Sequence, residues 1–392
     1  MSQMPPQTQN PDAVRTYSKA DSFVALKGVE NGLEAILQRI SRLSVTLAQQ
    51  SGDNYRNSIL DRACRALLSN AQQGEPEFHL REHIVGELAH VTDAELPRYL
   101  YYRYRYDAFP ITQELDAYPP CVQIETTSIC NYRCVFCYQT DQSFSDARQG
   151  HMGQMTLDTF KQVIDELEGQ VEAVTLASRG EPLICRQIED MLAYAAGKFL
   201  GLKINTNAWF LDEKKAHAIL QAEPNTLVFS ADAADPELYA KLRVNGKLER
   251  VLQNVERFAE IRAKHYPQSR TVTRVSGVNY SDQQDLAAID AFWHRYVDQV
   301  AFVDYNPWEN AYNAPSNGLN TPCSDLWRRA FVWWDGRVNP CDVDYRSILS
   351  LGNIHETPLT RLWTGGSYGQ LRQRHQSGER QSLHPCSGCA LI

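Results

Sequence analysis

Ten cysteines stand in this chain of 392 residues, and seven of them form two groups whose spacing fits metal ligation. The first group is a CxxxCxxC loop and the second lies near the end of the chain; their members are Cys130, Cys134 and Cys137, then Cys323, Cys341, Cys386 and Cys389. A reducing compartment disfavours disulfides, which leaves metal ligation or thiol chemistry as the expected use of these side chains. Three close thiolates can hold three irons of a [4Fe–4S] cluster and leave the fourth iron open to a substrate or cofactor. Four thiolates fully ligate one cluster or one zinc ion.

The first group has a zinc alternative, in which His151 completes a three-cysteine site. Two observations favour the cluster instead. Phe136 places an aromatic residue before the last cysteine of the loop, and the loop comes directly after a predicted strand. Cys64 and Cys121, which stand apart from both groups, are expected to be packing residues.

The cysteine loop lies at the start of a segment whose pattern predicts repeated βα units. From Cys121 onward, short apolar runs alternate with helical patterns, which is typical of a parallel sheet. Thr156, Asp212 and the pair Ser281 and Asp282 are the expected caps of intervening helices. Six such units form a partial barrel, in which reactive groups lie after the carboxyl ends of the strands. The predicted strands cover 122–127, 171–178, 202–207, 226–231, 271–277 and 299–304.

Residues 1–115 differ from the rest, because helical patterns dominate and strand signals are few. Gly28 and Gly32 weaken the first of these helices. The positions that flank its apolar seam also lack the pattern of opposite charges that pairs two helices in a coiled coil. We therefore predict an amphipathic helix packed on its own domain, with a homodimer through residues 26–47 as the alternative. The apolar seam of this helix alternates at spacings of three and four and consists of Leu26, Val29, Leu33, Ile36, Ile40, Leu43 and Leu47.

Net charge and hydropathy limit the classes of partner. A net charge of −8 disfavours a protein whose main task is to bind phosphate backbones. The stretch 98–106 alternates Arg and Tyr, which is compatible with stacking on RNA bases but more typical of an element that covers a neighbour. No segment approaches the roughly 20 apolar residues of a spanning helix, and residues 1–10 lack the apolar run of a signal peptide. These features predict a cytoplasmic protein that does not bind membranes, and they disfavour nucleic acid as a partner without excluding it.

The cysteine loop and the strand pattern together resemble the radical S-adenosylmethionine (SAM) superfamily over residues 121–304. Members carry CxxxCxφC, with an aromatic φ, after the first strand of a partial (βα)6 barrel. The resemblance implies that SAM chelates the open iron, and that one-electron reduction cleaves SAM to methionine and a 5′-deoxyadenosyl radical. It also implies an external one-electron reductant such as flavodoxin or ferredoxin. The protein binds and orients the cofactor and excludes water from it.

The same resemblance implies SAM contacts after each following strand. Ser178-Arg179-Gly180-Glu181-Pro182 is similar to the family's Gly-Gly-Glu-Pro turn, which meets the SAM ammonium group. Because Arg179 replaces a glycine, its guanidinium is expected to face a substrate carboxylate or phosphate. The remaining implied contacts are the Phe136 backbone to the adenine, Asn205, Asn207, Ser230 and Asp232 to the ribose or carboxylate, and Arg274 to the carboxylate. For Arg274, which lies on the fifth strand, a structural ion pair is the alternative role.

The second cysteine group resembles the SPASM/twitch extension of radical SAM enzymes. Asp335-Gly336 predicts a hairpin turn between 330–334 and 337–339, so that Cys341 leaves a short ribbon beside the other ligands. The run Asp-Gly-x-Val-x-Pro-Cys and the final Cys-x-x-Cys carry the resemblance. A full SPASM domain usually holds two auxiliary clusters, whereas four cysteines supply one. We therefore predict a twitch-type module with one fully ligated [4Fe–4S] cluster, used for electron transfer or structural support.

Two further features supply candidate catalytic residues. The segment after the sixth strand carries polar and aromatic groups suited to a hydroxylated ligand, and Tyr305, Asn306 and Glu309 are the predicted substrate contacts. Cys185 follows the Gly-Glu-Pro turn and is a candidate for returning a hydrogen atom, as a thiol does in some radical SAM epimerases. A small buried packing residue is the alternative for Cys185.

The sequence thus predicts an α/β enzyme with three parts: a helical N-terminal domain over 1–115, a TIM-like partial (βα)6 barrel over 116–310, and a small SPASM/twitch-type module over 311–392. The resemblance is nearest to members that act on carbohydrates or cyclitols. We therefore predict hydrogen abstraction from a polar small molecule, with dehydrogenation or epimerisation as the outcome. A peptide-modifying maturase is the first alternative, and a non-catalytic iron–sulfur electron carrier or RNA-binding protein is the second.

Overall fold

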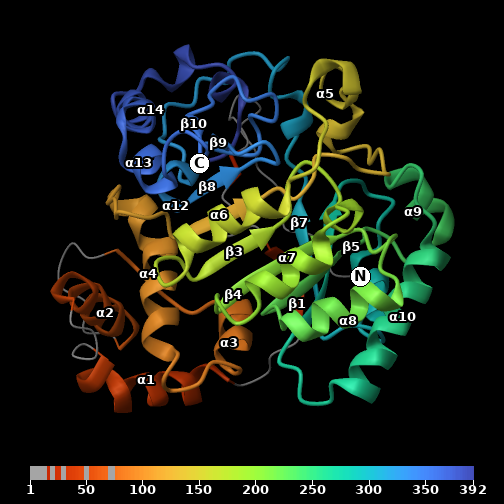
Figure 1. Cartoon of the computed structure of the whole chain (residues 1–392), viewed down its shortest axis with the longest axis horizontal. Coiled ribbons are helices and arrows are strands. Elements are labelled where there is room, and N and C mark those ends of the chain that lie inside the picture. Colours follow the sequence, from red (N-terminus) through yellow and green to blue (C-terminus); the bar gives the residue numbers. More distant parts are fainter. Residues whose placement is uncertain (1–15, 18–22, 28–31, 48–52, 69–75) are drawn as a thin grey trace.

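The computed structural model describes residues 16–17, 23–27, 32–47, 53–68 and 76–392. Its described strands form one ten-stranded sheet in the order β1-β7-β6-β5-β4-β3-β2-β8-β9-β10 (Figure 1). Strands β2 to β7 are parallel neighbours, β8 adds to β2 in parallel, and β1, β9 and β10 pair antiparallel. The strands are β1 Phe23–Lys27, β2 Cys121–Ile124, β3 Ala173–Leu176, β4 Gly201–Thr206, β5 Thr226–Ser230, β6 Val272–Asn279, β7 Gln299–Asp304, β8 Arg329–Val332, β9 Arg337–Asn339 and β10 Gly352–Asn353.

Helices precede the parallel sheet, connect its strands and follow it. Among the described residues, no helix has the length and apolar character needed to span a membrane. The helices are α1 Leu33–Leu47, α2 Asn54–Leu67, α3 Glu82–Leu88, α4 Leu96–Thr112, α5 Gln142–Ser145, α6 Leu157–Leu167, α7 Ile188–Ala195, α8 Glu213–Ala222, α9 Pro236–Leu242, α10 Leu248–His265, α11 Leu286–Trp293, α12 Asp325–Arg328, α13 Leu359–Thr364 and α14 Gly366–Gln376.

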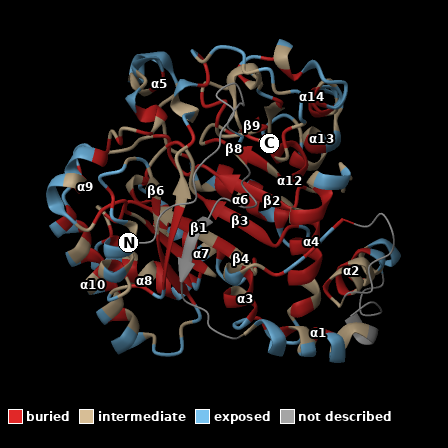
Figure 2. Cartoon of the chain, turned by 180° about the vertical axis from the view of Figure 1, so that it is seen from behind, coloured by how far each residue is buried: buried red, intermediate tan, exposed pale blue. Residues whose placement is uncertain are grey.

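The two faces of the parallel sheet differ in polarity, because side chains alternate along each strand. Val174 and Leu202 are level with each other and belong to the main apolar core, which the outer helices share. Figure 2 shows the buried strands surrounded by helices whose outer faces are exposed. The next residues along, Thr175 and Lys203, are also level and line a cavity inside the barrel. The sheet therefore presents an apolar face to its helices and a polar face to its interior.

The predicted fold class is confirmed, since the six predicted parallel strands all form and curve into a partial barrel. The last of them, Gln299–Asp304, has the predicted bounds. One helix start was predicted wrongly. Helix α11 begins at Leu286, capped by Asp285, and not near Ser281 and Asp282. The physical reason is that the Gln284 side chain accepts the backbone N–H of Ser281 at 2.9 Å, which holds this segment in a turn.

The N-terminal helices close the amino end of the barrel. Helices α1 to α4 form a second apolar cluster, which reaches the starts of β2 and β3 through Cys121 and Ala173. The Arg/Tyr stretch lies in α4, where Arg103 and Arg105 are buried and form ion pairs at 3.0 Å with Asp107 and Asp116. This helix covers a neighbour, as the sequence favoured, and does not present Arg103 and Arg105 to RNA.

A continuous helix over 26–47 is not formed. Leu26 lies in β1, which pairs antiparallel with β7, and α1 begins at Leu33. Val29 lies outside the described residues. Ile36 and Ile40 of the predicted seam are buried in the N-terminal cluster, so α1 packs on its own domain. The seam was interrupted because the free edge of β7 offers backbone hydrogen bonds to the segment before the helix.

The predicted hairpin is confirmed in β8 and β9, which pair antiparallel. Gly336 stands in its turn with a φ of 80°, in the left-handed region that favours glycine. Because β8 also pairs with β2, the ribbon that leads to Cys341 continues the sheet that carries the cysteine loop.

Candidate active site

A cavity of about 470 Å³ runs through the interior of the partial barrel. Cys130, Cys134 and Cys137 line it beyond the carboxyl ends of the strands, and His83 and Glu87 of α3 line it at the amino ends. This volume is typical of small-ligand sites. Because one cavity joins the thiol loop to the polar barrel interior, a bound ligand can contact both.

The cysteine loop is docked on the segment after β5. Backbone hydrogen bonds run from Arg133 N to the Val244 carbonyl at 3.0 Å and from Val135 N to the Leu242 carbonyl at 3.1 Å. Phe136 is buried beside these contacts in a small apolar cluster. These interactions hold the loop rigidly over the cavity, as a ligand set for a metal centre requires.

Polar side chains surround the sulfur atoms of the loop. Arg243 Nη1 lies 3.8 Å from Cys134 Sγ, and Asn207 Nδ2 lies 4.0 Å from Cys130 Sγ. Burial raises the pKa of all three thiols, that of Cys137 to about 12. Metal coordination deprotonates a thiol despite such a shift, and the positive charge of Arg243 stabilises the resulting thiolate.

Electrostatic interactions connect the four C-terminal cysteines, of which Cys341 follows the β8–β9 hairpin. None of the four forms a disulfide within the described chain, and Cys323 is buried whereas the others are half-buried. Burial raises the pKa of Cys341 well above its usual value, and the neighbouring Cys386 and Cys323 raise it further. Cys389 acts on Cys323 and on Cys386 in the same way. The predicted ligand set therefore shares one electrostatic neighbourhood.

His151 does not stand where a zinc site would need it. Its ring packs on Phe144, with ring centroids 5.7 Å apart, and its carbonyl accepts a hydrogen bond from Trp334 Nε1 at 3.1 Å. In the part of the chain that the structure describes, no three His, Cys, Asp or Glu side chains are placed to hold a single metal ion. His151 therefore does not complete a ligand set with the three loop thiols.

Two family models match this chain. Residues 124–290 match the radical SAM superfamily, and residues 323–390 match the SPASM iron–sulfur cluster-binding domain. The chain belongs to the radical SAM superfamily. Its two domains imply a SAM-binding [4Fe–4S] cluster, an auxiliary cluster and SAM itself.

Curated radical SAM relatives differ in the reactions they are named for. Mycofactocin maturase of Mycobacterium tuberculosis is 28% identical over 278 residues, which are 71% of this chain and 62% of that protein. This chain thus spans less than two thirds of that relative. The SAM-dependent 2-deoxy-scyllo-inosamine dehydrogenase of Niallia circulans is 21% identical over 273 residues, which are 68% of this chain and 91% of the dehydrogenase.

A solved structure shares the radical SAM fold. Streptococcus suis SuiB bound to the precursor peptide SuiA has a TM-score of 0.50 and 13% sequence identity, and the match covers 88% of this chain and 84% of that chain. At this level of identity the likeness concerns the fold alone.

The cavity fits the groups that a radical SAM domain binds. The three loop thiols face it, and three thiolates leave one iron of a cluster open. Asn205 Oδ1 and Ser178 Oγ line the cavity and are buried without a hydrogen-bond partner among the described residues. Buried polar atoms ordinarily have a partner, so these two fit a polar ligand such as SAM.

The Gly180–Glu181 turn lies against the segment that leads into the cysteine loop. A Cβ on Gly180 would stand 2.3 Å from the Thr127 carbonyl oxygen, so only glycine fits there. Glu181 N donates to the Ile129 carbonyl at 2.9 Å. The Glu181 carboxylate accepts hydrogen bonds from Thr206 Oγ1 at 2.5 Å and from Asn207 N at 2.7 Å, while its burial raises its pKa. This turn thus ties β3 and β4 to the loop.

Arg179 is among the residues that line the cavity, but its guanidinium is engaged by groups of the protein. Its Nε and Nη2 form a two-point ion pair with the Glu125 carboxylate at 2.6 and 2.5 Å, and both side chains are buried. Nη1 donates to the Tyr345 carbonyl at 2.8 Å, and the guanidinium lies over Trp333. Arg179 therefore joins the barrel to the C-terminal module.

Asp232 and the Phe136 carbonyl are occupied by protein groups, in contrast to their predicted SAM contacts. Asp232 is fully buried outside the cavity lining; its carboxylate pairs with Arg243 Nε at 2.5 Å and accepts Val278 N at 2.7 Å. The Phe136 carbonyl accepts Trp308 Nε1 at 2.9 Å. Sequence reasoning missed Arg243, which lines the cavity in place of Asp232.

The remaining SAM candidates divide between the two ends of the cavity. Asn205, Asn207 and Ser230 line it toward the carboxyl ends of β4 and β5, whereas Pro182 is buried outside its lining. Arg274 lines it at the amino end, where its Nε donates to Gln299 Oε1 at 2.8 Å. The charge neighbours of Arg274 are Glu87 and Tyr99 of the N-terminal helices, which places Arg274 at the end of the cavity opposite the cysteine loop.

The predicted substrate contacts after β7 lie outside the cavity lining. The Tyr305 hydroxyl donates to the Glu309 carboxylate and its ring packs against Tyr280, while Asn306 is buried. Trp308 of the same segment does line the cavity. Proximity along the chain thus identified the segment but not the side chain that faces inward.

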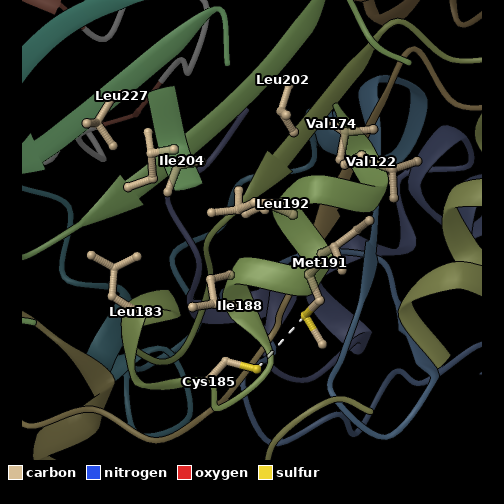
Figure 3. Packing of buried hydrophobic residues seen from close by; sticks show 14 of the residues in the cluster. Val122, Val174, Leu183, Cys185, Ile188, Met191, Leu192, Leu202, Ile204 and Leu227 are labelled. Atoms are coloured by element: carbon tan, nitrogen blue, oxygen red, sulfur yellow. Dashed lines mark hydrogen bonds between the residues drawn. The ribbon is translucent and has the colours of Figure 1, made fainter. Parts of the chain in front are cut away.

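Cys185 belongs to the apolar core and not to the cavity. It is 2% exposed, and its Sγ lies 3.9 Å from Met191 Sδ among the side chains of the outer helices (Figure 3). Val174 and Leu202, which belong to the same cluster, point away from the barrel interior. The structure therefore places Cys185 as a packing residue, away from the cavity where a hydrogen donor would have to stand.

Replacing Gly180 with alanine should weaken SAM binding. The added Cβ meets backbone atoms of Thr127 and Ser128, so the Glu181 turn must move away from the cysteine loop. We expect the Kd of the reconstituted protein for SAM to rise at least about tenfold, the loss that one misplaced hydrogen-bonded contact typically brings. Equilibrium dialysis with labelled SAM measures it. Gly369→Ala in α14, where a Cβ meets no atom within 4 Å, is the control, and equal SAM binding by both variants would refute the steric argument.

Proposed function

We propose that this radical SAM enzyme abstracts a hydrogen atom from a polar small molecule of the carbohydrate or cyclitol type and dehydrogenates or epimerises it. The observation that carries the proposal is the single cavity that joins the loop thiols to a polar barrel interior. When bound, the reduced cluster and SAM together supply the 5′-deoxyadenosyl radical. The protein residues bind and orient SAM and the substrate and exclude water from them.

The proposed site has three sets of ligands. Cys130, Cys134 and Cys137 hold the SAM cluster, and the C-terminal cysteines hold a fully ligated auxiliary cluster. Gly180 and Glu181 form the turn that receives SAM, with Asn205 and Ser230 beside them. Arg243 places positive charge near Cys134. Flavodoxin or ferredoxin in the cytoplasm is the proposed one-electron reductant, and the three parts 1–115, 116–310 and 311–392 are the proposed domains.

The chemistry of the interior supports a hydroxylated substrate. Between the two ends of the cavity the strands present amide and hydroxyl groups, from Gln123, Thr175, Asn205, Thr226 and Ser276. Such groups donate to and accept from hydroxyls at the same time, which a carbohydrate or cyclitol requires. The similarity to 2-deoxy-scyllo-inosamine dehydrogenase, over 91% of that enzyme, points to the same substrate type.

A peptide-modifying maturase is the second candidate. It is supported by the similarity to mycofactocin maturase over 71% of this chain and by the shared fold of SuiB, which binds a precursor peptide. Helices α3 and α4 contribute side chains to the amino end of the cavity, which limits the length of any chain that could enter there. This enclosure favours a small molecule.

Deuterium transfer separates the two candidates. Reconstituted enzyme, SAM and dithionite should move deuterium from ring-labelled aminocyclitols or sugars into 5′-deoxyadenosine, because hydrogen abstraction labels that product. Mass spectrometry of 5′-deoxyadenosine measures the transfer, and unlabelled substrate is the control. Short peptides encoded beside the gene, labelled with deuterium, form the comparison set. Transfer from a peptide alone would replace the small-molecule proposal with the maturase.

A further inference from the structure

The amino end of the cavity carries positively charged side chains that the SAM chemistry does not use. Lys203 of β4 and Arg274 of β6 both line it, on strands that flank β5. Their register partners on β5 are Thr226 and Val228, two residues apart on one face. The two cations therefore approach the same region of the barrel interior from either side of β5.

Lys203 lacks a partner within the described part of the chain: no hydrogen bond or ion pair joins its ammonium group to any of those residues. Lys203 is half-buried and its side chain lines the cavity, where an ammonium group without a protein partner can meet an anionic group of a ligand. Burial lowers the pKa of Lys203 to about 8, and the positive charges of Arg274 and Arg329 lower it further. The ammonium form still predominates at pH 7, so the site holds a cation in need of an anion.

The other charges around Lys203 do not neutralise this region. Arg329 forms an ion pair with Asp325 at 3.4 Å, and Cys121 is a thiol whose pKa is raised by burial. Glu87 is a carboxylate that acts on both Lys203 and Arg274, and it accepts a hydrogen bond from the Tyr99 hydroxyl at 2.6 Å. His83 is neutral, because burial and the neighbouring arginines lower its pKa to about 2. One carboxylate thus faces two cations.

We propose that the amino end of the cavity binds an anionic group of the substrate, a carboxylate or a phosphate, with Lys203 and Arg274 as its ligands. This inference rests on the proposed function and narrows the substrate to an acid-bearing molecule. A guanidinium and an ammonium are the side chains that bind such oxygens, the first by paired hydrogen bonds and the second as a point charge.

The distance along β4 fits this arrangement. Asn207, just beyond the end of β4, lies 4.0 Å from Cys130 Sγ, whereas Lys203 stands four residues earlier in the strand. About 13 Å of strand therefore separates the two ends of the cavity, at about 3.3 Å per residue. A sugar or cyclitol anchored by its acid group at Lys203 extends toward the loop, where its ring carbons meet the radical.

Anion binding by the reconstituted enzyme tests the proposal without any need for turnover. Inorganic phosphate and malonate are titrated calorimetrically at constant ionic strength against a chloride baseline. We expect saturable binding of at least one of them, and the one that binds identifies phosphate or carboxylate. In Lys203→Gln the Kd should rise about tenfold or more, as the loss of a charge-assisted hydrogen bond predicts.

Two further variants keep the test decisive. Lys203→Arg retains the charge and should bind the anion within a few fold of the wild type, which separates loss of charge from misfolding. Lys241→Gln removes an exposed lysine of α9 and should leave the Kd unchanged. No saturable binding of either anion, or equal binding by wild type and Lys203→Gln, would overturn the proposal. Absence of SAM cleavage would refute the proposed function and leave this binding result untouched.

Discussion

Replacing Cys130, Cys134 and Cys137 together with alanine should lower the iron content of the anaerobically reconstituted protein from about eight to about four per chain, one [4Fe–4S] cluster of two. Formation of 5′-deoxyadenosine from SAM and reductant should fall to the level of a protein-free reaction. The physical reason is that these three thiols face the cavity and form the donor set that leaves an iron open for SAM. Iron and sulfide assays and chromatography of 5′-deoxyadenosine on the same samples measure both effects.

The C-terminal cysteines supply the matched comparison. A Cys341, Cys386 and Cys389 triple alanine variant should also keep about four irons. It should retain SAM cleavage, because the auxiliary cluster that it loses is fully ligated and has no open iron for SAM. Cys64→Ala, in the apolar cluster of the N-terminal helices, should change neither quantity. About four irons in the wild type and in both triple variants, or zinc in their place, would contradict the two-cluster assignment.

The barrel and its cysteine loop were predictable because their signals are local. Apolar runs marked β3 and β4, and the loop followed the first strand with its ligands inside eight residues. Lys203 was not singled out from the sequence, although it stands within the predicted strand 202–207. Only the structure shows that its side chain lines the cavity.

One cause of the failures is that the partner of a polar group belongs to another element of the fold. Asp232 has the spacing of a ribose ligand, but Arg243 reaches its carboxylate from the end of α9. The direction of a side chain also escaped detection. Cys185 follows the SAM turn in the chain, but the short helical turn Pro182–Ile184 between them directs the Cys185 thiol into the apolar core. Tertiary contacts decide both cases, and spacing alone does not record them.

Replacing Arg179 with methionine should destabilise the protein by about 3–5 kcal/mol, the loss typical when one partner of a buried ion pair is removed. The cause is the Glu125 carboxylate, which is fully buried and would be left with no guanidinium beside it. Two further contacts to the C-terminal module end with the same substitution, the hydrogen bond to the Tyr345 carbonyl and the packing on Trp333. We expect the melting temperature to fall by roughly 6–10 °C, at about 2 °C per kcal/mol for a large domain. Circular dichroism during heating measures it.

The decisive comparison for this ion pair is a second substitution at Glu125. In Arg179→Met with Glu125→Gln the buried charge disappears, so most of the lost melting temperature should return, because a neutral amide costs less to bury than a carboxylate. Arg148→Met removes an arginine of the same type whose side chain is 87% exposed in its pair with Asp146, and it should shift the melting temperature by less than about 1 °C. If Arg179→Met melted like Arg148→Met, or if Glu125→Gln gave no recovery, the stability of the junction between barrel and C-terminal module would not depend on this pair. Recovery of melting temperature without recovery of SAM cleavage would instead show that the guanidinium also sets the position of the Gly180–Glu181 turn that follows it.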